Sequence, residues 1–180
     1  MIVVACALYA MLIYATTQMT ARYNAFVKYN EDYIACHEAA AQMNAASDYL
    51  TEQVRLFTQN MDIRHMELYF QEADIDRRRE KAIAILKQYE PTDEELQALE
   101  AARGSSLDLM EREIYAMKLI VVANGYDEAR IPEDVRKVQL LHYDKQLSSQ
   151  QQIARARDLV YNRGYMDAKA LIKAHGDHFV

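Results

Sequence analysis

The sequence predicts an all-α protein, and three observations support that prediction. The 180 residues include only 4 Gly and 2 Pro, while residues that favour helices, such as Ala, Leu, Met, Glu and Lys, are abundant. Apolar or small residues recur three and four positions apart along most of the chain, which is the spacing of a helix face. Runs of β-branched residues are nearly absent outside the first few residues and the short run Ile120-Val121-Val122.

The longest expected helix covers Ala21–Met61, and the rest of the fold is organised around it. Its seam alternates steps of three and four residues, as in a coiled coil, through Tyr33, Cys36, Ala40, Met43, Ser47, Leu50, Val54, Phe57 and Met61. No Gly or Pro interrupts this stretch, so at ~1.5 Å per residue it reaches about 60 Å. A helix with one narrow apolar stripe needs partner helices to cover it.

Residues 1–21 carry no charged side chain, and the first charge is Arg22. A membrane span needs about 20 apolar residues, so we interpret 1–21 as a transmembrane anchor. Tyr23, Tyr29 and Tyr33 follow it at the position of an interfacial aromatic belt. The alternative is a cleaved signal peptide, which is less consistent with the missing basic leader and cleavage site.

Three further long helices are expected after the first. Asp62 caps the second, and Pro91 ends it. Thr92–Glu95 is a capping box that opens the third, whose expected stripe is Leu96, Leu99, Leu107, Met110, Ile114, Met117 and Val121. A short extra helix begins near Pro132. Ser148 and Gln151 then open the fourth long helix, with Ile153, Ala156, Val160, Gly164, Ala168 and Leu171 on its apolar side.

We therefore expect an antiparallel up-down four-helix bundle whose first helix extends from an N-terminal transmembrane segment. The domains are 1–21 as the anchor, 22–175 as the bundle, and 176–180 as a flexible end leading to a second span. In this topology the fourth helix returns to the bilayer. That places Tyr161 and Tyr165 at the membrane interface opposite the first tyrosine cluster.

Charge and motif content exclude several functions. The net charge is −6 with both signs interspersed, so nucleic acid is not an expected partner. Cys6 and Cys36 lie far apart on one helix and cannot pair within the chain. His175 and His178 are the only pair near each other that suggests a metal, and we expect a solvated chain end there instead. We find no motif for an enzyme, a metal or another cofactor.

The charged segment Ala73–Lys81 allows two interpretations. The first is a solvated helix face of ion pairs three and four residues apart. The second is an arginine turned inward to hold an anionic ligand. If a small molecule binds, we expect it in the membrane-distal half of the bundle, where Ser47, Tyr69, Arg78 and Tyr115 converge.

Several segments together resemble a known class of domain. They are Ala46–Phe57, Tyr69–Glu72, Arg78–Ala82, Asp144–Ser148, Ala156–Val160, and Tyr165 with Lys169–Ile172. Across roughly Ala21–Ile172 the chain is similar to the extracytoplasmic four-helix-bundle sensor domains of bacterial membrane receptors. It looks most like those that precede GGDEF diguanylate cyclase modules, and more distantly like chemoreceptor input bundles.

The resemblance implies a signal-input domain in the cell membrane, with the bundle outside the cytoplasm. It also implies a second span, a cytoplasmic output module, an unknown small-molecule or protein ligand, and a homodimer. The open alternative is a membrane-anchored helical scaffold or interaction protein without a small ligand. A metal-dependent bundle enzyme is a third possibility, which would require stoichiometric metal bound through His175 and His178.

Overall fold

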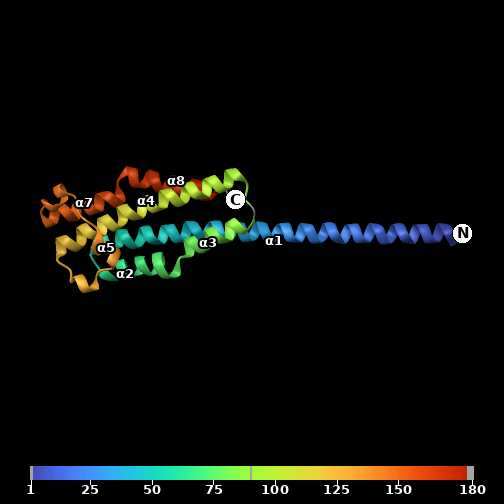
Figure 1. Cartoon of the computed structure of the whole chain (residues 1–180), viewed down its shortest axis with the longest axis horizontal. Coiled ribbons are helices and arrows are strands. Elements are labelled where there is room, and N and C mark those ends of the chain that lie inside the picture. The colour runs from blue at the N-terminus through green and yellow to red at the C-terminus, as the bar shows by residue number, and fades with distance from the viewer. Residues whose placement is uncertain (1, 90, 178–180) are drawn as a thin grey trace.

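The computed structural model describes residues 2–89 and 91–177, and no strand occurs among them. The protein is all-α, as the sequence predicts (Figure 1). The elements in chain order are α1 (Ile2–Asn60), α2 (Ile63–Phe70), the π-helical turn η1 (Gln71–Asp76), α3 (Arg78–Leu86), η2 (Lys87–Tyr89), α4 (Asp93–Asn124), η3 (Glu128–Arg130), α5 (Glu133–Lys137), α6 (His142–Lys145), α7 (Ser149–Tyr161) and α8 (Arg163–Asp177).

Helix α1 is continuous from the apolar segment into the core, which confirms the expected long first helix. Its buried side chains begin at Ala39 and continue to Thr58. The part before Ala39 projects away from the other helices (Figure 1). The N-terminal part is long and apolar enough to cross a membrane, and none of that apolar window is covered by the rest of the protein.

The second expected helix is not one helix, because η1 and a left-handed residue divide it into α2 and α3. Asp62 caps α2 as predicted, accepting a hydrogen bond from the Arg64 amide. Arg77 has a positive φ of 50° between η1 and α3. The Arg77 amide donates to the Glu72 carbonyl at 2.8 Å, closing the wide π-helical turn. The apolar spacing of the sequence does not reveal this break.

Helix α4 begins with the predicted Thr92–Glu95 capping box, and Gly125 ends it in a left-handed conformation. Its buried face differs from the predicted stripe. Leu96 and Leu107 are 39% and 46% exposed. Leu99, Met117 and Val121 of the predicted stripe are buried, as expected. The other buried residues of α4 are Ala102, Ser106, Leu109, Glu113, Ala116, Leu119 and Ile120, and most of them continue one heptad-like line from Leu99. The prediction missed this line because it includes two polar side chains.

The fourth expected helix is also divided, into α7 and α8. Ser148 and Gln151 form the predicted capping box of α7. Asn162 interrupts the helix with extended backbone, and its Oδ1 accepts a hydrogen bond from the Tyr165 amide at 2.9 Å. Arg55 on α1 donates to the Val160 carbonyl at the end of α7. The expected short helix is present as α5, with Pro132 at its N-cap.

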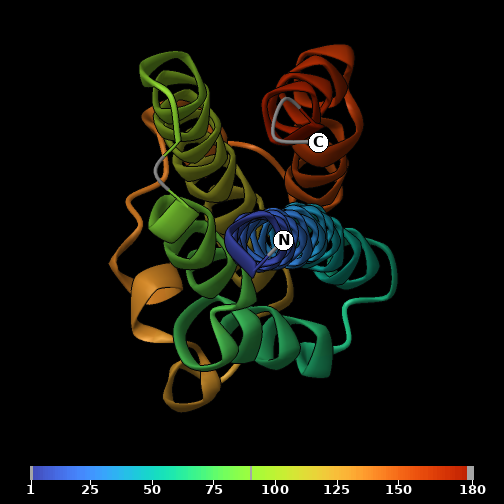
Figure 2. The same ribbon diagram turned by 90° about the vertical axis from the view of Figure 1, so that its right-hand side faces the viewer.

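The helices form rows, namely α1, α2 with α3, α4, and α7 with α8. Successive rows run alternately away from and toward the N-terminal end of α1 (Figure 1). Viewed along α1, the elements α2 and α3 lie on one side of it, with α4 and α8 on the other (Figure 2). A large core cluster joins α1, α2, α4, α7 and α8. A smaller cluster of Ala39, Met43, Ala82, Ile83, Leu86 and Leu99 lies where α1 enters the bundle.

Candidate functional site

A buried carboxylate lies at the centre of the large core. Glu113 on α4 is 2% exposed. Its Oε2 accepts a hydrogen bond of 2.7 Å from the hydroxyl of Tyr69 on α2, and its Oε1 is in short contact with the hydroxyl of Tyr165 on α8. Tyr165 Oη also lies 3.0 Å from Thr51 Oγ1 on α1. One glutamate thus connects four separate segments of the chain.

The surroundings of Glu113 shift the pKa of its carboxyl. Burial raises the pKa of the Glu113 carboxyl above its ordinary value, although the two tyrosine hydroxyls and the charges of Lys169 and Arg79 act in the opposite direction. Burial and the nearby carboxylate also raise the pKa of both Tyr69 and Tyr165. The chemistry available to this cluster is proton binding.

A second polar cluster lies between α3 and α4. Arg79 is 7% exposed, and its guanidinium contacts Ser106 Oγ and lies 3.3 Å from Met110 Sδ. The same guanidinium is paired with the Glu80 carboxylate. One arginine of the charged segment therefore does turn inward, but it is Arg79, and its anionic partner belongs to the protein itself.

Glu72 is also buried, and it stabilises the start of α3. Its carboxylate accepts hydrogen bonds from the Arg78 amide at 3.1 Å and from Arg78 Nε at 2.6 Å. The Arg78 guanidinium lies 5.2 Å from the centre of the Tyr49 ring on α1. Glu72, unlike Glu113, is thus an ion-paired buried glutamate.

A third buried carboxylate, Asp144, fixes the connection that leads into α7. Asp144 Oδ2 accepts a hydrogen bond of 2.6 Å from the Tyr115 hydroxyl. The backbone carbonyl of Asp144 accepts a hydrogen bond from the Gln152 side chain. Arg155 Nε lies 3.8 Å from the other carboxylate oxygen. These contacts attach α6 to α4 and α7.

The four predicted ligand-binding residues have separate surroundings in the structure. Tyr69 contacts Glu113, Arg78 contacts Glu72, and Tyr115 contacts Asp144. Ser47 lines a groove between α1 and α8 together with Asp48 and Lys169. Each of the four thus faces a different set of neighbours, and their role in ligand binding stays a prediction.

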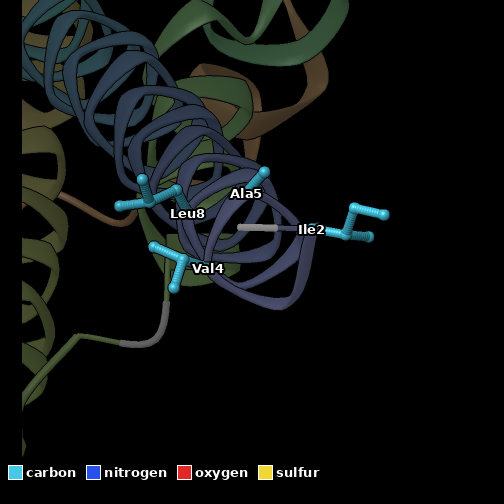
Figure 3. A pocket seen from close by; sticks show the side chains of 4 residues that line it. All are labelled: Ile2, Val4, Ala5 and Leu8. Atoms are coloured by element: carbon cyan, nitrogen blue, oxygen red, sulfur yellow. The ribbon is translucent and has the colours of Figure 1, made fainter.

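The groove beside Ser47 is small. Its volume of about 10 Å³ is room for about one water molecule. Lys169 and Asp48 form an ion pair at its rim. Of two larger hollows on α1, one is lined by Ile2, Val4, Ala5 and Leu8, whose side chains surround one isolated helix (Figure 3). That hollow is exposed apolar surface on the segment that is long and apolar enough to cross a membrane.

The structure corrects two of the five expected interfacial tyrosines. Tyr165 is fully buried against Glu113. Tyr161 contacts the side chain of Gln59, at the opposite end of α1 from the apolar segment. Both residues lie in the middle of the row that α7 and α8 form, since that row continues to Asp177, and not at the end from which the apolar segment leaves. Tyr23, Tyr29 and Tyr33 are exposed on the projecting part of α1, and their position at a bilayer stays a prediction.

Sequence reasoning missed Glu113, Thr51 and Arg79 as parts of a site, and it placed Tyr165 at a membrane interface. A signal for Glu113 was available, because Ala102, Ala116 and Leu109 place it on one heptad-like line of α4. No comparable signal exists for Thr51, which lies beside the predicted α1 seam. Among the described residues, no three His, Cys, Asp or Glu side chains are grouped to hold a metal. His178 lies outside those residues.

Comparison with known proteins does not assign the chain. No protein-family model matches it, and neither a curated protein nor a solved structure does. The functional interpretation therefore depends on the geometry described above.

Proposed function

We propose that this chain is the signal-input region of a bacterial membrane receptor, with a four-helix-bundle sensor outside the cytoplasm. The observation that carries the proposal is the continuity of α1, which runs unbroken from the apolar segment to the far end of the core. A continuous helix is stiff enough to transmit a small slide or rotation into the membrane. A ligand or partner protein would favour one packing of the helical rows over another.

The direction of the last helix supports the same proposal. Helix α8 runs back toward the end of the bundle from which α1 leaves (Figure 1). A chain that continued beyond it would meet the same bilayer in a second span. We propose a cytoplasmic output module beyond that span, of the diguanylate cyclase type that the sequence resemblance implies, and a homodimer as the working form.

The location of the bundle can be tested with a single cysteine. Glu52 is exposed on the bundle part of α1. In a Cys6→Ala/Cys36→Ala background, Glu52→Cys should react in intact cells with a maleimide that cannot cross the membrane. A matched Glu94→Cys, on the exposed first turn of α4, should react equally. Labelling of both only after lysis would place the bundle in the cytoplasm and contradict the proposal.

The ligand site is tested by changing Arg78. A melting-temperature screen with small anions and amino acids would identify a binder, because a ligand specific for the folded bundle raises its melting temperature. Arg78→Ala should reduce that rise at least severalfold if Arg78 contacts the ligand. An unchanged response would remove Arg78 from the predicted site.

The second candidate function is a membrane-anchored scaffold without a small ligand. The observation that favours it is the small groove, with room for about one water molecule. A label on Cys6, which is exposed in the apolar segment, separates the two functions when the protein is placed in lipid nanodiscs. A receptor changes the environment of this label when the bundle changes its packing, and a scaffold does not.

A further inference from the structure

The hydrogen bonds around Glu113 can be balanced against the hydrogens available to make them. Four oxygen–oxygen contacts form a chain: Tyr69 to Glu113, Glu113 to Tyr165, Tyr165 to Thr51, and Thr51 to the Ser47 carbonyl, the last at 3.1 Å. For each contact to be a hydrogen bond, one hydrogen must lie between its two oxygens. The three hydroxyl groups supply three hydrogens. When Glu113 is ionised, one contact in the chain therefore lacks a hydrogen.

A neutral Glu113 supplies the missing hydrogen. Tyr69 then donates to Glu113 Oε2, the carboxylic acid donates from Oε1 to Tyr165 Oη, Tyr165 donates to Thr51 Oγ1, and Thr51 donates to the Ser47 carbonyl. Every donor has an acceptor, and every contact holds one hydrogen. With Glu113 ionised, every hydroxyl still donates one hydrogen bond, but one of the four contacts is left without a hydrogen. Only the neutral acid makes all four contacts hydrogen bonds, so the observed set of contacts favours the neutral acid.

We propose that Glu113 is a proton-binding site, neutral in this packing, and that its ionisation loosens the hydrogen-bonded connection between α8 and α1. Only one part of this inference rests on the proposed function: if the chain is a receptor, the proton is its stimulus. The chemistry of the site stands on the four contacts. An ionised carboxylate attracts the Tyr165 hydrogen more strongly than a neutral hydroxyl does. The hydrogen bond that breaks on ionisation is therefore one that involves Thr51.

Charged groups on α1, α3 and α8 act on Glu113 or on Tyr165 beside it, and α2 contributes the Tyr69 hydroxyl. Arg79 on α3 and Lys169 on α8 favour the ionised form through their charges, and Arg55 on α1 acts on Tyr165. Arg79 is paired with Glu80, and Lys169 is paired with Asp48. Among the described residues, no Lys, Arg or His forms an ion pair with Glu113 itself. Burial therefore outweighs the distant positive charges, and the pKa of Glu113 is raised.

The end of the hydrogen-bond chain explains how protonation would act on the membrane-directed helix. Thr51 and Ser47 both lie on α1, and the last hydrogen bond is made to the α1 backbone. Ionisation of Glu113 leaves either the Tyr165–Thr51 contact or the Thr51–Ser47 contact without a hydrogen. The hydrogen bonding of Thr51, the α1 residue that contacts Tyr165 on α8, therefore depends on the protonation of a residue on α4.

Infrared spectroscopy of the full chain in detergent tests the site directly. In a pH series the wild-type protein should keep the carbonyl stretch of a neutral carboxylic acid to higher pH than Glu113→Gln does. The matched control is Glu72→Gln, which removes an equally buried but ion-paired glutamate and should keep the band to the same pH as the wild type. Disappearance of the band at the same pH in the wild type and Glu113→Gln, or its earlier loss in Glu72→Gln instead, would overturn the proposal.

The connection to α1 is tested by the methyl resonance of Thr51. In the wild type this resonance should shift with pH at the same midpoint as the infrared band, and in Glu113→Gln it should stay constant. The amide introduced by Glu113→Gln can donate to Tyr165 and accept from Tyr69, so this variant reproduces the neutral state. A Thr51 resonance whose chemical shift does not change as Glu113 titrates would overturn the coupling. Failure of the proposed function is separate, because it appears in the labelling of Glu52→Cys.

Discussion

Two glutamates of this protein are equally hidden from water and are held in different ways. Glu72 and Glu113 are each 2% exposed. Glu72 lies against the Arg78 guanidinium and the first amide of α3, whereas Glu113 contacts two phenol hydroxyls. A buried carboxylate is stable when its charge is paired, or when it keeps its proton. The side chains around each glutamate, rather than its depth, decide between the two.

The raised pKa of Glu113 predicts how stability depends on pH. The folded state binds this proton more tightly than the unfolded state, whose reference value is 4.5. The stabilisation by Glu113 is therefore fully present below the unfolded pKa and is lost as the pH rises through the folded pKa. The loss amounts to about 1.4 kcal/mol for each unit by which the pKa is raised.

Urea unfolding of the wild type and Glu113→Gln at a series of pH values measures this effect. The free energy of unfolding of the wild type minus that of Glu113→Gln should fall with rising pH and then level off. The subtraction cancels the other titrating groups that both proteins share. A difference that rises with pH would mean that Glu113 is stabilised as a carboxylate.

Arg77 is a second residue whose local conformation makes a prediction. Its φ of 50° is left-handed, a conformation that costs a residue with a Cβ about 1 kcal/mol. Its side chain is exposed. Arg77→Gly should therefore raise the free energy of unfolding by up to about 1 kcal/mol, reduced somewhat by the greater freedom of Gly in the unfolded chain. Thermal unfolding of Arg77→Gly beside Arg77→Ala checks this, since Ala removes the same side chain and keeps the strain.

At the scale of elements, the sequence predicts where helices begin better than where they break. The caps at Asp62, Thr92 and Ser148 are confirmed, because each depends on residues within one turn. The break between α7 and α8 also involves a partner far along the chain. Arg55 binds the free end of α7 by donating to the Val160 carbonyl, across 105 positions. No local pattern predicts a contact of that range.

The interruption between α7 and α8 leads to a prediction for Asn162. Its side chain caps α8 by accepting from the Tyr165 amide, and it thereby fixes where Tyr165 enters the core. Asn162→Ala should lower the free energy of unfolding by about 1 kcal/mol, the usual cost of losing an N-cap. Asn162→Asp keeps the cap and should stay near the wild-type value. Chemical unfolding of both variants provides the measurement, and equal losses would show that the cap contributes nothing.

The site was less predictable than the fold, and the reason lies in its polarity. The sequence analysis predicted an apolar stripe along α4, but the residues of α4 that face the core include Ser106 and Glu113. The sequence pattern indicated Tyr69 and missed the glutamate that binds its hydroxyl. It placed Tyr165 at a membrane, although that side chain is fully buried. Tyrosine is suited to both environments, so composition alone does not separate them.

At the scale of the whole molecule, α1 has two parts that differ in what covers them. No side chain before Ala39 is among the buried residues of α1. From Ala39 onward the same helix contributes to both core clusters. A protein whose first part is stabilised only by its own helix and its surroundings should be divisible there. The part of α1 before Ala39 should then add nothing to the stability of the bundle.

Two truncations test this division. Removal of residues 2–21 should leave the melting temperature of the bundle nearly unchanged, because this segment contributes no side chain to the core. Removal of residues 2–44 also deletes Ala39 and Met43, which pack against Leu86 and Leu99 in the smaller cluster. Loss of a buried side chain of the size of Met costs about 2–5 kcal/mol, so the shorter protein should melt at a clearly lower temperature. Equal melting of the two truncations would show that the smaller cluster adds nothing, whereas a large loss from the first alone would show that the apolar segment supports the bundle directly.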